Sequence, residues 1–166
     1  MDKGKTTKNS RIGIDIPEID ETKLPAAMEI IERAASLMAE KDCDSDPEAE
    51  KDLAKLQGEL RDLSGNSKIQ IRDFQRYWSY TDLETMARKT LLPVPFKTHV
   101  TDGQIKEIVL HILTHKEAET DWWLTFLKIN TGLDNLTDYI FYPVFVGLDA
   151  QATLEQIADK IITDRK

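Results

Sequence analysis

The stretch Thr101-Asp-Gly-Gln-Ile-Lys-Glu-Ile-Val-Leu-His-Ile112 indicates the helical character of this 166-residue chain. Thr101 and Gln104 are spaced as in a capping box, in which two side chains satisfy free N–H groups at the start of a helix. Apolar residues then recur at i, i+3, i+4 and i+7, the spacing of one helical face. They are Ile105, Ile108, Val109 and Ile112. The pattern predicts an amphipathic helix that begins just after Thr101.

Downstream of this helix, the sequence predicts two further helices and a short aromatic segment between them. A helix is expected to start near Glu117 and to end at Thr131-Gly132, with its aromatic and aliphatic residues facing inward. These inward residues are Trp123, Phe126 and Leu127. The aromatic segment spans residues 138–143. Thr153 and Gln156 then form a second capping box at the start of a last helix.

Upstream, two helices are expected to form a hairpin. The first has Thr22 as its predicted N-cap and an apolar face consisting of Leu24, Met28, Ile31, Ala35 and Met38. The second is capped by Asp46, with Pro47 at its first position, and ends near Gly65. Its apolar seam consists of Leu53, Leu56, Leu60 and Leu63.

The segment between this hairpin and Thr101 is also read as helical. The spacing of Phe74, Tyr77 and Trp78 predicts a short helix within residues 69–80, and Thr81 is the predicted cap of a further helix. The sequence Leu92-Pro-Val-Pro95 ends that helix. The chain as a whole is therefore predicted to be all-α.

We place the domain boundary at this Pro-x-Pro element. Residues 1–23 are expected to form an extended or disordered tail, read as an arm that docks on the body rather than as a lone strand. Residues 24–95 are expected to form an N-terminal helical region, and residues 96–166 a C-terminal domain.

Composition limits the classes of partner and compartment. Thirty Asp and Glu residues against 22 Lys and Arg give a net charge of -8, which favours a basic partner protein and argues against nucleic acid. The longest apolar run, residues 139–148, contains Pro143 and is too short to cross a membrane. The first ten residues are followed by no apolar stretch, so we do not expect them to be a secretory signal. Cys43, the single cysteine, is expected to be an inert thiol in a surface turn. These features predict a cytoplasmic protein.

The sequence contains no recognisable catalytic constellation. Glu107, His111 and His115 lie at i, i+4 and i+8, so a metal-dependent hydrolase is one alternative. The histidines are more simply explained as residues at the rim of an amphipathic helix. Nucleotide, phosphate and redox motifs are absent from the sequence. We therefore predict a non-enzymatic protein with no metal and no cofactor.

The most informative region joins an acidic stretch to an aromatic segment. Residues 117–138 hold five acidic residues and one base, Lys128, and they lead into Asp138-Tyr-Ile-Phe-Tyr-Pro143. Aromatic anchors inside a charged rim are typical of protein-binding hot spots. The alternative is that Tyr139, Ile140 and Phe141 belong to the core.

This segment resembles the signature of the immunity proteins of nuclease-type colicins and pyocins. Those are small acidic proteins with a distorted four-helix fold, whose short third helix reads Asp-x-Ile-Tyr-Tyr-Pro. Asp138, Ile140, Tyr142 and Pro143 match this signature, and Phe141 replaces its first tyrosine. The similarity covers about residues 97–166.

The resemblance implies a four-helix C-terminal domain that neutralises a basic nuclease by binding alone. It places the shared anchor at Asp138, Phe141 and Tyr142, and the specificity positions at Glu117, Asp121 and Leu124. Lys128 and the non-acidic loop after Pro143 depart from the family pattern. The alternative function is a helical adaptor that shares only this fold and assembles through the leucine seam of residues 53–63.

Overall fold

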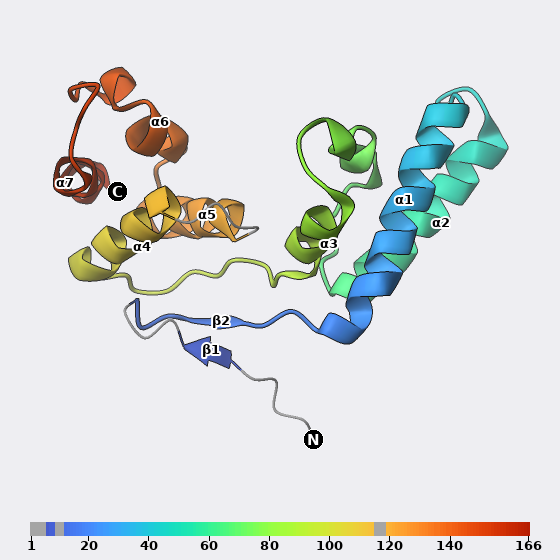
Figure 1. The fold of residues 1–166 in the computed structure, drawn as a ribbon, viewed down its shortest axis with the longest axis horizontal. Helices are drawn as coiled ribbons and strands as arrows, with labels where there is room; N and C mark the ends of the chain where they lie inside the picture. Colours follow the sequence, from blue (N-terminus) through green and yellow to red (C-terminus); the bar gives the residue numbers. More distant parts are fainter. Residues whose placement is uncertain (1–5, 9–11, 115–118) are drawn as a thin grey trace. The chain divides into compact units, whose positions relative to one another are not determined.

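A computed structural model of the chain describes residues 6–8, 12–114 and 119–166. These residues form an all-helical structure except for a ladder of two three-residue strands, and they contain no helix with the length and apolarity needed to cross a membrane. The chain divides into two compact units (Figure 1). The N-terminal unit comprises Pro17–Val94, and the C-terminal unit combines Thr6–Ile16 with Pro95–Lys166.

A helical hairpin forms the body of the N-terminal unit. Helix α1 (Leu24–Glu40) packs against α2 (Pro47–Ser64), and the two lie side by side in Figure 1. Asp46 caps α2 as expected, because its carboxylate accepts the backbone N–H groups of Glu48 and Ala49 at 3.0 and 3.2 Å. Gly65 ends α2 at a φ of 70°, a conformation that favours glycine.

The leucine seam of α2 is used inside this unit. Leu53, Leu56 and Leu60 are 3%, 5% and 0% exposed. They share one hydrophobic core with the buried face of α1 and with α3 (Leu83–Leu91). The seam is therefore not an open surface.

Two of the predicted helix caps were wrong. Thr22 lies in a 3₁₀ turn, η1 (Glu21–Lys23), whose cap is Asp20; the Asp20 carboxylate accepts the Thr22 N–H at 3.0 Å. Likewise, Asp82 rather than Thr81 caps α3, accepting the Thr85 N–H at 2.8 Å. In both places a carboxylate, rather than the expected hydroxyl, accepts a backbone N–H: Asp20 does so for the turn η1 and Asp82 for α3, while α1 itself has no side-chain cap.

Residues 69–80 form two 3₁₀ turns instead of the expected short helix. These are η2 (Ile71–Phe74) and η3 (Tyr77–Ser79). Ile71 and Phe74 lie three residues apart, on the same side of a 3₁₀ turn, and both are buried in the core. Trp78 is left 56% exposed.

Cys43 is buried, which contradicts the expectation of a surface thiol. Its side chain is 5% exposed and belongs to the N-terminal core. The Sγ atom lies 3.8 Å from the Lys41 carbonyl and 4.0 Å from the Leu37 carbonyl. The turn after α1 therefore folds back over the end of that helix, which local sequence patterning does not reveal.

Four helices form the body of the C-terminal unit. Helix α4 packs against α5 and α7, and the short α6 packs against the same two helices. Their bounds, with that of the 3₁₀ turn η4, are α4 Asp102–Thr114, α5 Thr120–Thr131, α6 Leu136–Phe141, η4 Pro143–Val146 and α7 Leu154–Asp164. Both predicted capping boxes are confirmed, with Thr101 and Gln104 bonded reciprocally at 2.9 and 3.2 Å.

Aromatic and aliphatic side chains of α5 fill the centre of this unit. Trp123, Phe126 and Leu127 are fully buried, as predicted. The Trp122 ring stacks on Phe126 with 5.3 Å between centroids, and Phe96 approaches Phe126 edge-on at 5.4 Å. Such aromatic contacts add to the free energy gained from burial alone.

The N-terminal arm belongs to the C-terminal unit. Ile12 and Ile14 are 2% and 7% exposed, and the Gln104 side chain donates a hydrogen bond to the Ile12 carbonyl at 3.1 Å. Strand β2 (Asp15–Pro17) pairs with β1 (Thr6–Lys8), whereas an unpaired arm was expected. Gly13, at a φ of 70°, lies in the segment that joins the two strands.

Candidate partner-binding surface

The predicted aromatic segment divides into a buried side and an exposed side. Leu136, Tyr139 and Ile140 are 3%, 6% and 3% exposed, so this side of α6 faces the core. Phe141 and Tyr142, in contrast, are 43% and 56% exposed. The alternative that this segment belongs to the core therefore holds for Tyr139 and Ile140 but not for Phe141.

Proline and glycine turn the chain outward immediately after α6. Tyr142 has φ and ψ of -135° and 58°, which ends the helix, and Pro143 follows it as a buried residue. The next 3₁₀ turn closes with a hydrogen bond of 2.9 Å from the Phe145 N–H to the Tyr142 carbonyl, and it ends at Gly147 with φ 84°. This geometry exposes two more apolar side chains.

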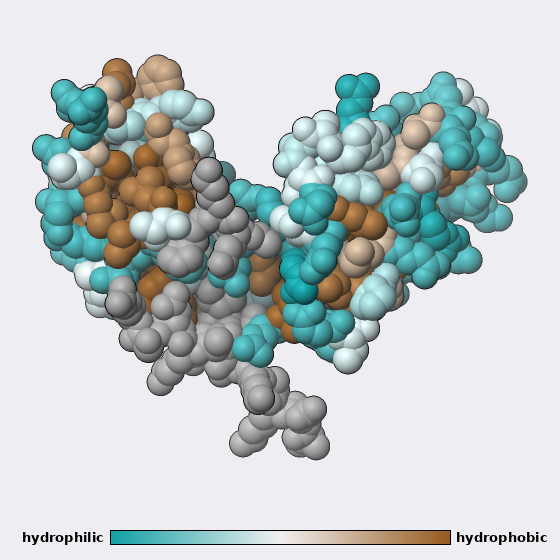
Figure 2. All heavy atoms as spheres, in the orientation of Figure 1, coloured by the Kyte–Doolittle hydropathy of each residue, from teal (hydrophilic) through white to brown (hydrophobic). Residues whose placement is uncertain are grey.

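Those two residues, Val144 and Phe145, were missed by the sequence analysis. They are 57% and 75% exposed. Their exposure results from the 3₁₀ turn η4 that follows Tyr142, which the sequence pattern does not reveal. We define the aromatic turn as Phe141, Tyr142, Val144 and Phe145. Figure 2 shows hydrophobic side chains gathered on the C-terminal unit, whereas the visible surface of α1 and α2 is mostly hydrophilic.

A hydrogen-bonded triad fixes α6 beneath the aromatic turn. The Tyr139 hydroxyl donates to the Asp164 carboxylate of α7 at 2.8 Å, and Lys160 forms an ion pair with the same carboxylate at 3.0 Å. Lys160 first, and then Tyr139, lowers the pKa of Asp164 below its ordinary value. Burial, followed by the hydrogen bond to Asp164, raises the pKa of Tyr139 from 10.0 to about 12.

The segment of sequence that contains the aromatic turn is acidic. Residues 129–159 contain five acidic residues and no Lys or Arg. Three of the five are balanced by lysines: Asp134 by Lys128 at 3.3 Å, and Glu155 and Asp159 by Lys106 at 3.1 and 3.5 Å. The other two are Asp138, which is half-buried at the start of α6, and Asp149, which is exposed. A partner at this surface meets a negative field.

The structure brings only some of the predicted site residues together. Asp138, Phe141 and Tyr142 belong to α6 and its end. Asp121 is exposed in the first turn of α5 and Leu124 is half-buried on the same helix, which packs against α6. Glu117 lies outside the described residues.

The histidine alternative finds no support in the described residues. No three His, Cys, Asp or Glu side chains among them are arranged to hold a metal ion. The His111 Nε2 atom lies 3.8 Å from a Glu119 oxygen, and its ring meets Trp123 edge-on at 5.9 Å. His111 thus packs at the rim of the α4–α5 interface, and His115 lies outside the described residues.

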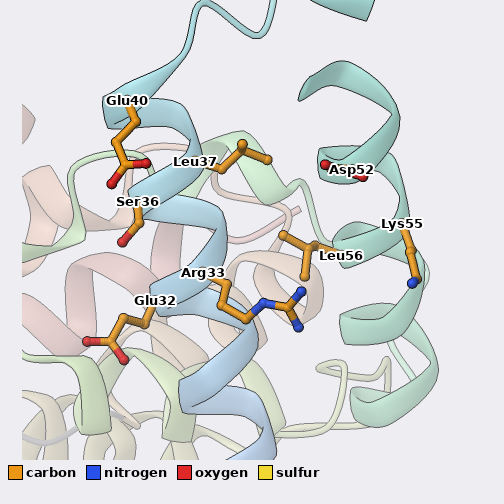
Figure 3. A pocket seen from close by; sticks show the side chains of 8 residues that line it. All are labelled: Glu32, Arg33, Ser36, Leu37, Glu40, Asp52, Lys55 and Leu56. Carbon is orange, nitrogen blue, oxygen red and sulfur yellow. The ribbon is translucent and has the colours of Figure 1, made fainter. Parts of the chain in front are cut away.

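The N-terminal unit has a hollow of about 380 Å³ between α1 and α2 (Figure 3). Arg33 and Leu56 point toward each other across it, and Leu37 points toward α2. Its charged lining residues are exposed and of mixed sign: Glu32, Arg33, Glu40, Asp52 and Lys55. Catalytic groups are generally set in a water-excluded pocket, so we assign no chemistry to this hollow.

Comparison with protein families, with curated proteins and with solved structures finds no match for this chain.

Proposed function

We propose that this chain is a non-enzymatic binding protein that docks a basic partner protein through the aromatic turn. The observation that carries the proposal is the exposure of four consecutive or nearly consecutive apolar side chains, from 43% at Phe141 to 75% at Phe145. Isolated exposed apolar residues are common on protein surfaces, but a contiguous exposed cluster marks an interaction site.

The energetics favour a protein partner. Aromatic side chains that become buried at the centre of an interface commonly cost ~2 kcal/mol or more when truncated. The aromatic turn is also held before binding, because Tyr139 and Pro143 beneath it are buried. A pre-ordered surface loses less conformational entropy on association than a flexible one.

The negative field favours a basic partner. Asp138 and Asp149 lie in a stretch with no Lys or Arg, and the whole chain has a net charge of -8. Opposite charge on a partner accelerates encounter and selects against acidic proteins.

From the resemblance of the segment 138–143 to nuclease immunity proteins, we propose that the partner is a nuclease toxin met in the cytoplasm. Four helices and an exposed aromatic end of the third, α6, are compatible with that proposal. Inhibition would follow from charge and bulk placed near the path of the DNA substrate, with no reaction catalysed by this chain.

The adaptor alternative loses its proposed assembly surface. Leu53, Leu56 and Leu60 are at most 5% exposed within the N-terminal core. Assembly through them would require this unit to unfold.

A capture experiment with matched variants tests the proposal. The tagged full chain, Tyr142→Ala and Tyr80→Ala are used to capture proteins from the native cell; Tyr80, at 62% exposure in the N-terminal unit, is the matched control. We expect one basic protein to be retained by the wild type and Tyr80→Ala and lost with Tyr142→Ala. After purification it should cleave DNA, and an equimolar amount of this chain should stop the cleavage.

Two results would count against the proposal. Equal capture by Tyr142→Ala would remove the aromatic turn from the interface. A Tyr142-dependent partner without nuclease activity would leave the docking surface in place and overturn the immunity-like role.

A further inference from the structure

Tyr142 and Phe145 form a pair of exposed rings with a defined spacing. Their centroids are 6.1 Å apart and their planes are tilted by 38°. The rings are 56% and 75% exposed, and the 2.9 Å hydrogen bond from the Phe145 N–H to the Tyr142 carbonyl fixes the backbone between them. The pair is therefore both accessible and positioned.

We propose that this ring pair binds an arginine side chain of the partner protein, an inference that rests on the aromatic turn being the docking surface. The face of an aromatic ring is negative, so a cation within ~6 Å of its centroid is attracted. Because the two centroids are 6.1 Å apart, one cation can lie within that range of both rings.

The surrounding charges favour a cation supplied from outside the chain. Residues 129–159 provide no Lys or Arg of their own, while Asp138 and Asp149 add negative potential. The lysines that bound this stretch form ion pairs elsewhere, Lys128 with Asp134 at 3.3 Å and Lys160 with Asp164 at 3.0 Å.

Guanidinium fits this pair better than ammonium does. It is planar, stacks on aromatic faces and is more weakly hydrated, so its transfer from water to the rings costs less free energy. An aliphatic side chain of the partner would also bury the rings, but it would gain nothing from the acidic surroundings.

A peptide titration separates these possibilities. The probes are Ac-Gly-Gly-Arg-Gly-Gly-NH2 and the same peptide with citrulline, which keeps the shape of arginine and removes its charge. NMR signals of the Tyr142 and Phe145 rings are followed in the full chain at millimolar peptide. We expect the arginine peptide to shift both rings and to bind about two- to fivefold more tightly than the citrulline peptide.

The matched variants are Phe145→Leu, which keeps an apolar side chain without a ring, and Phe96→Leu, which alters an exposed phenylalanine outside the pair. Phe145→Leu should reduce arginine-peptide affinity about two- to fivefold and Phe96→Leu should not. Equal binding of the two peptides, the absence of ring shifts, or an unchanged affinity in Phe145→Leu would overturn the inference.

The peptide titration and the capture experiment can fail separately. Loss of partner capture by Tyr142→Ala together with equal binding of the two peptides would refute the arginine site alone. Selective binding of the arginine peptide to the rings, with partner capture unaffected by Tyr142→Ala, would refute docking through the aromatic turn and leave the ring pair as an arginine site that this partner does not use.

Discussion

The Tyr139 hydroxyl of α6 donates a 2.8 Å hydrogen bond to the Asp164 carboxylate of α7. Tyr139 is 6% exposed. The next residue, Ile140, is also buried, and the one after it, Phe141, is exposed. This bond joins the short helix that presents the aromatic turn to the last helix of the C-terminal unit. The position of the aromatic turn therefore depends on a contact between residues 25 positions apart.

Tyr139→Phe removes this hydrogen bond and keeps the ring. We expect the free energy of unfolding of the C-terminal unit to fall by about 1 kcal/mol, because a hydrogen bond to a carboxylate is lost and the acceptor can regain water. Urea unfolding is followed by tryptophan fluorescence in a Trp78→Phe background, in which the remaining Trp122 and Trp123 both report on this unit.

Tyr142→Phe is the control for that experiment, since it removes a hydroxyl from a side chain that is 56% exposed. Its stability should change by less than about 0.5 kcal/mol. Equal stabilities for Tyr139→Phe and Tyr142→Phe would show that the bond to Asp164 contributes nothing.

The raised pKa of Tyr139 predicts a specific alkaline dependence. The folded pKa of about 12 exceeds the ordinary value of 10.0, so the resulting contribution to stability is complete below pH 10 and is lost as the pH rises toward 12. The difference in unfolding free energy between the wild type and Tyr139→Phe should therefore shrink across this interval. Urea unfolding at a series of pH values measures this difference in unfolding free energy. A difference that stays constant from about pH 9 to about pH 11.5 would contradict the prediction.

The N-terminal arm is expected to stabilise the C-terminal unit. Ile12→Ala should lower its unfolding free energy by about 2 to 5 kcal/mol, because Ile12 is 2% exposed. The milder Ile12→Val should lower it by about 0.5 to 1.5 kcal/mol and serves if the alanine variant does not fold. Ile19→Ala, in the N-terminal unit, should leave the Trp122 and Trp123 transition unchanged. An unchanged transition in both Ile12 variants would show that the arm does not contribute.

Association with the partner should depend on salt. Exposed charges are screened beyond ~10 Å at 0.1 M ionic strength, so the association rate should fall several-fold at high salt while the dissociation rate changes less. Asp149→Asn should weaken this dependence, whereas Asp52→Asn, the same change on α2, should not. Stopped-flow measurements with the captured protein test this, and a salt-independent association rate would contradict steering by the acidic surface.

Local interactions made much of the fold predictable. The capping box of Thr101 and Gln104 and the cap formed by Asp46 are set by residues at most three positions apart, and both were identified from the sequence. The caps at Asp20 and Asp82 were missed because a nearby threonine is also a plausible acceptor in each case. Only the geometry of the first turn shows that the aspartate, and not the threonine, accepts the N–H.

Features that depend on distant contacts were not predictable in this way. Cys43 is buried because the turn containing it packs against the end of α1, and the pairing of β1 with β2 depends on a second strand that the sequence pattern does not reveal. In the candidate site, Tyr139 is buried and Phe141 is exposed because they lie on different faces of α6. The 3.6-residue helical period does not identify the buried face from sequence when a helix has only six residues. Phe145 was missed because its exposure results from the turn after Pro143.

The affinity of the captured basic protein for the purified full chain is the most direct test of the docking surface. Dissociation constants are measured by calorimetry for the wild type, Tyr142→Ala and Tyr80→Ala, with circular dichroism confirming that each variant is folded. We predict a loss of about tenfold or more for Tyr142→Ala and less than about twofold for Tyr80→Ala. Equal affinities for all three proteins would contradict the proposal that the partner docks on the aromatic turn.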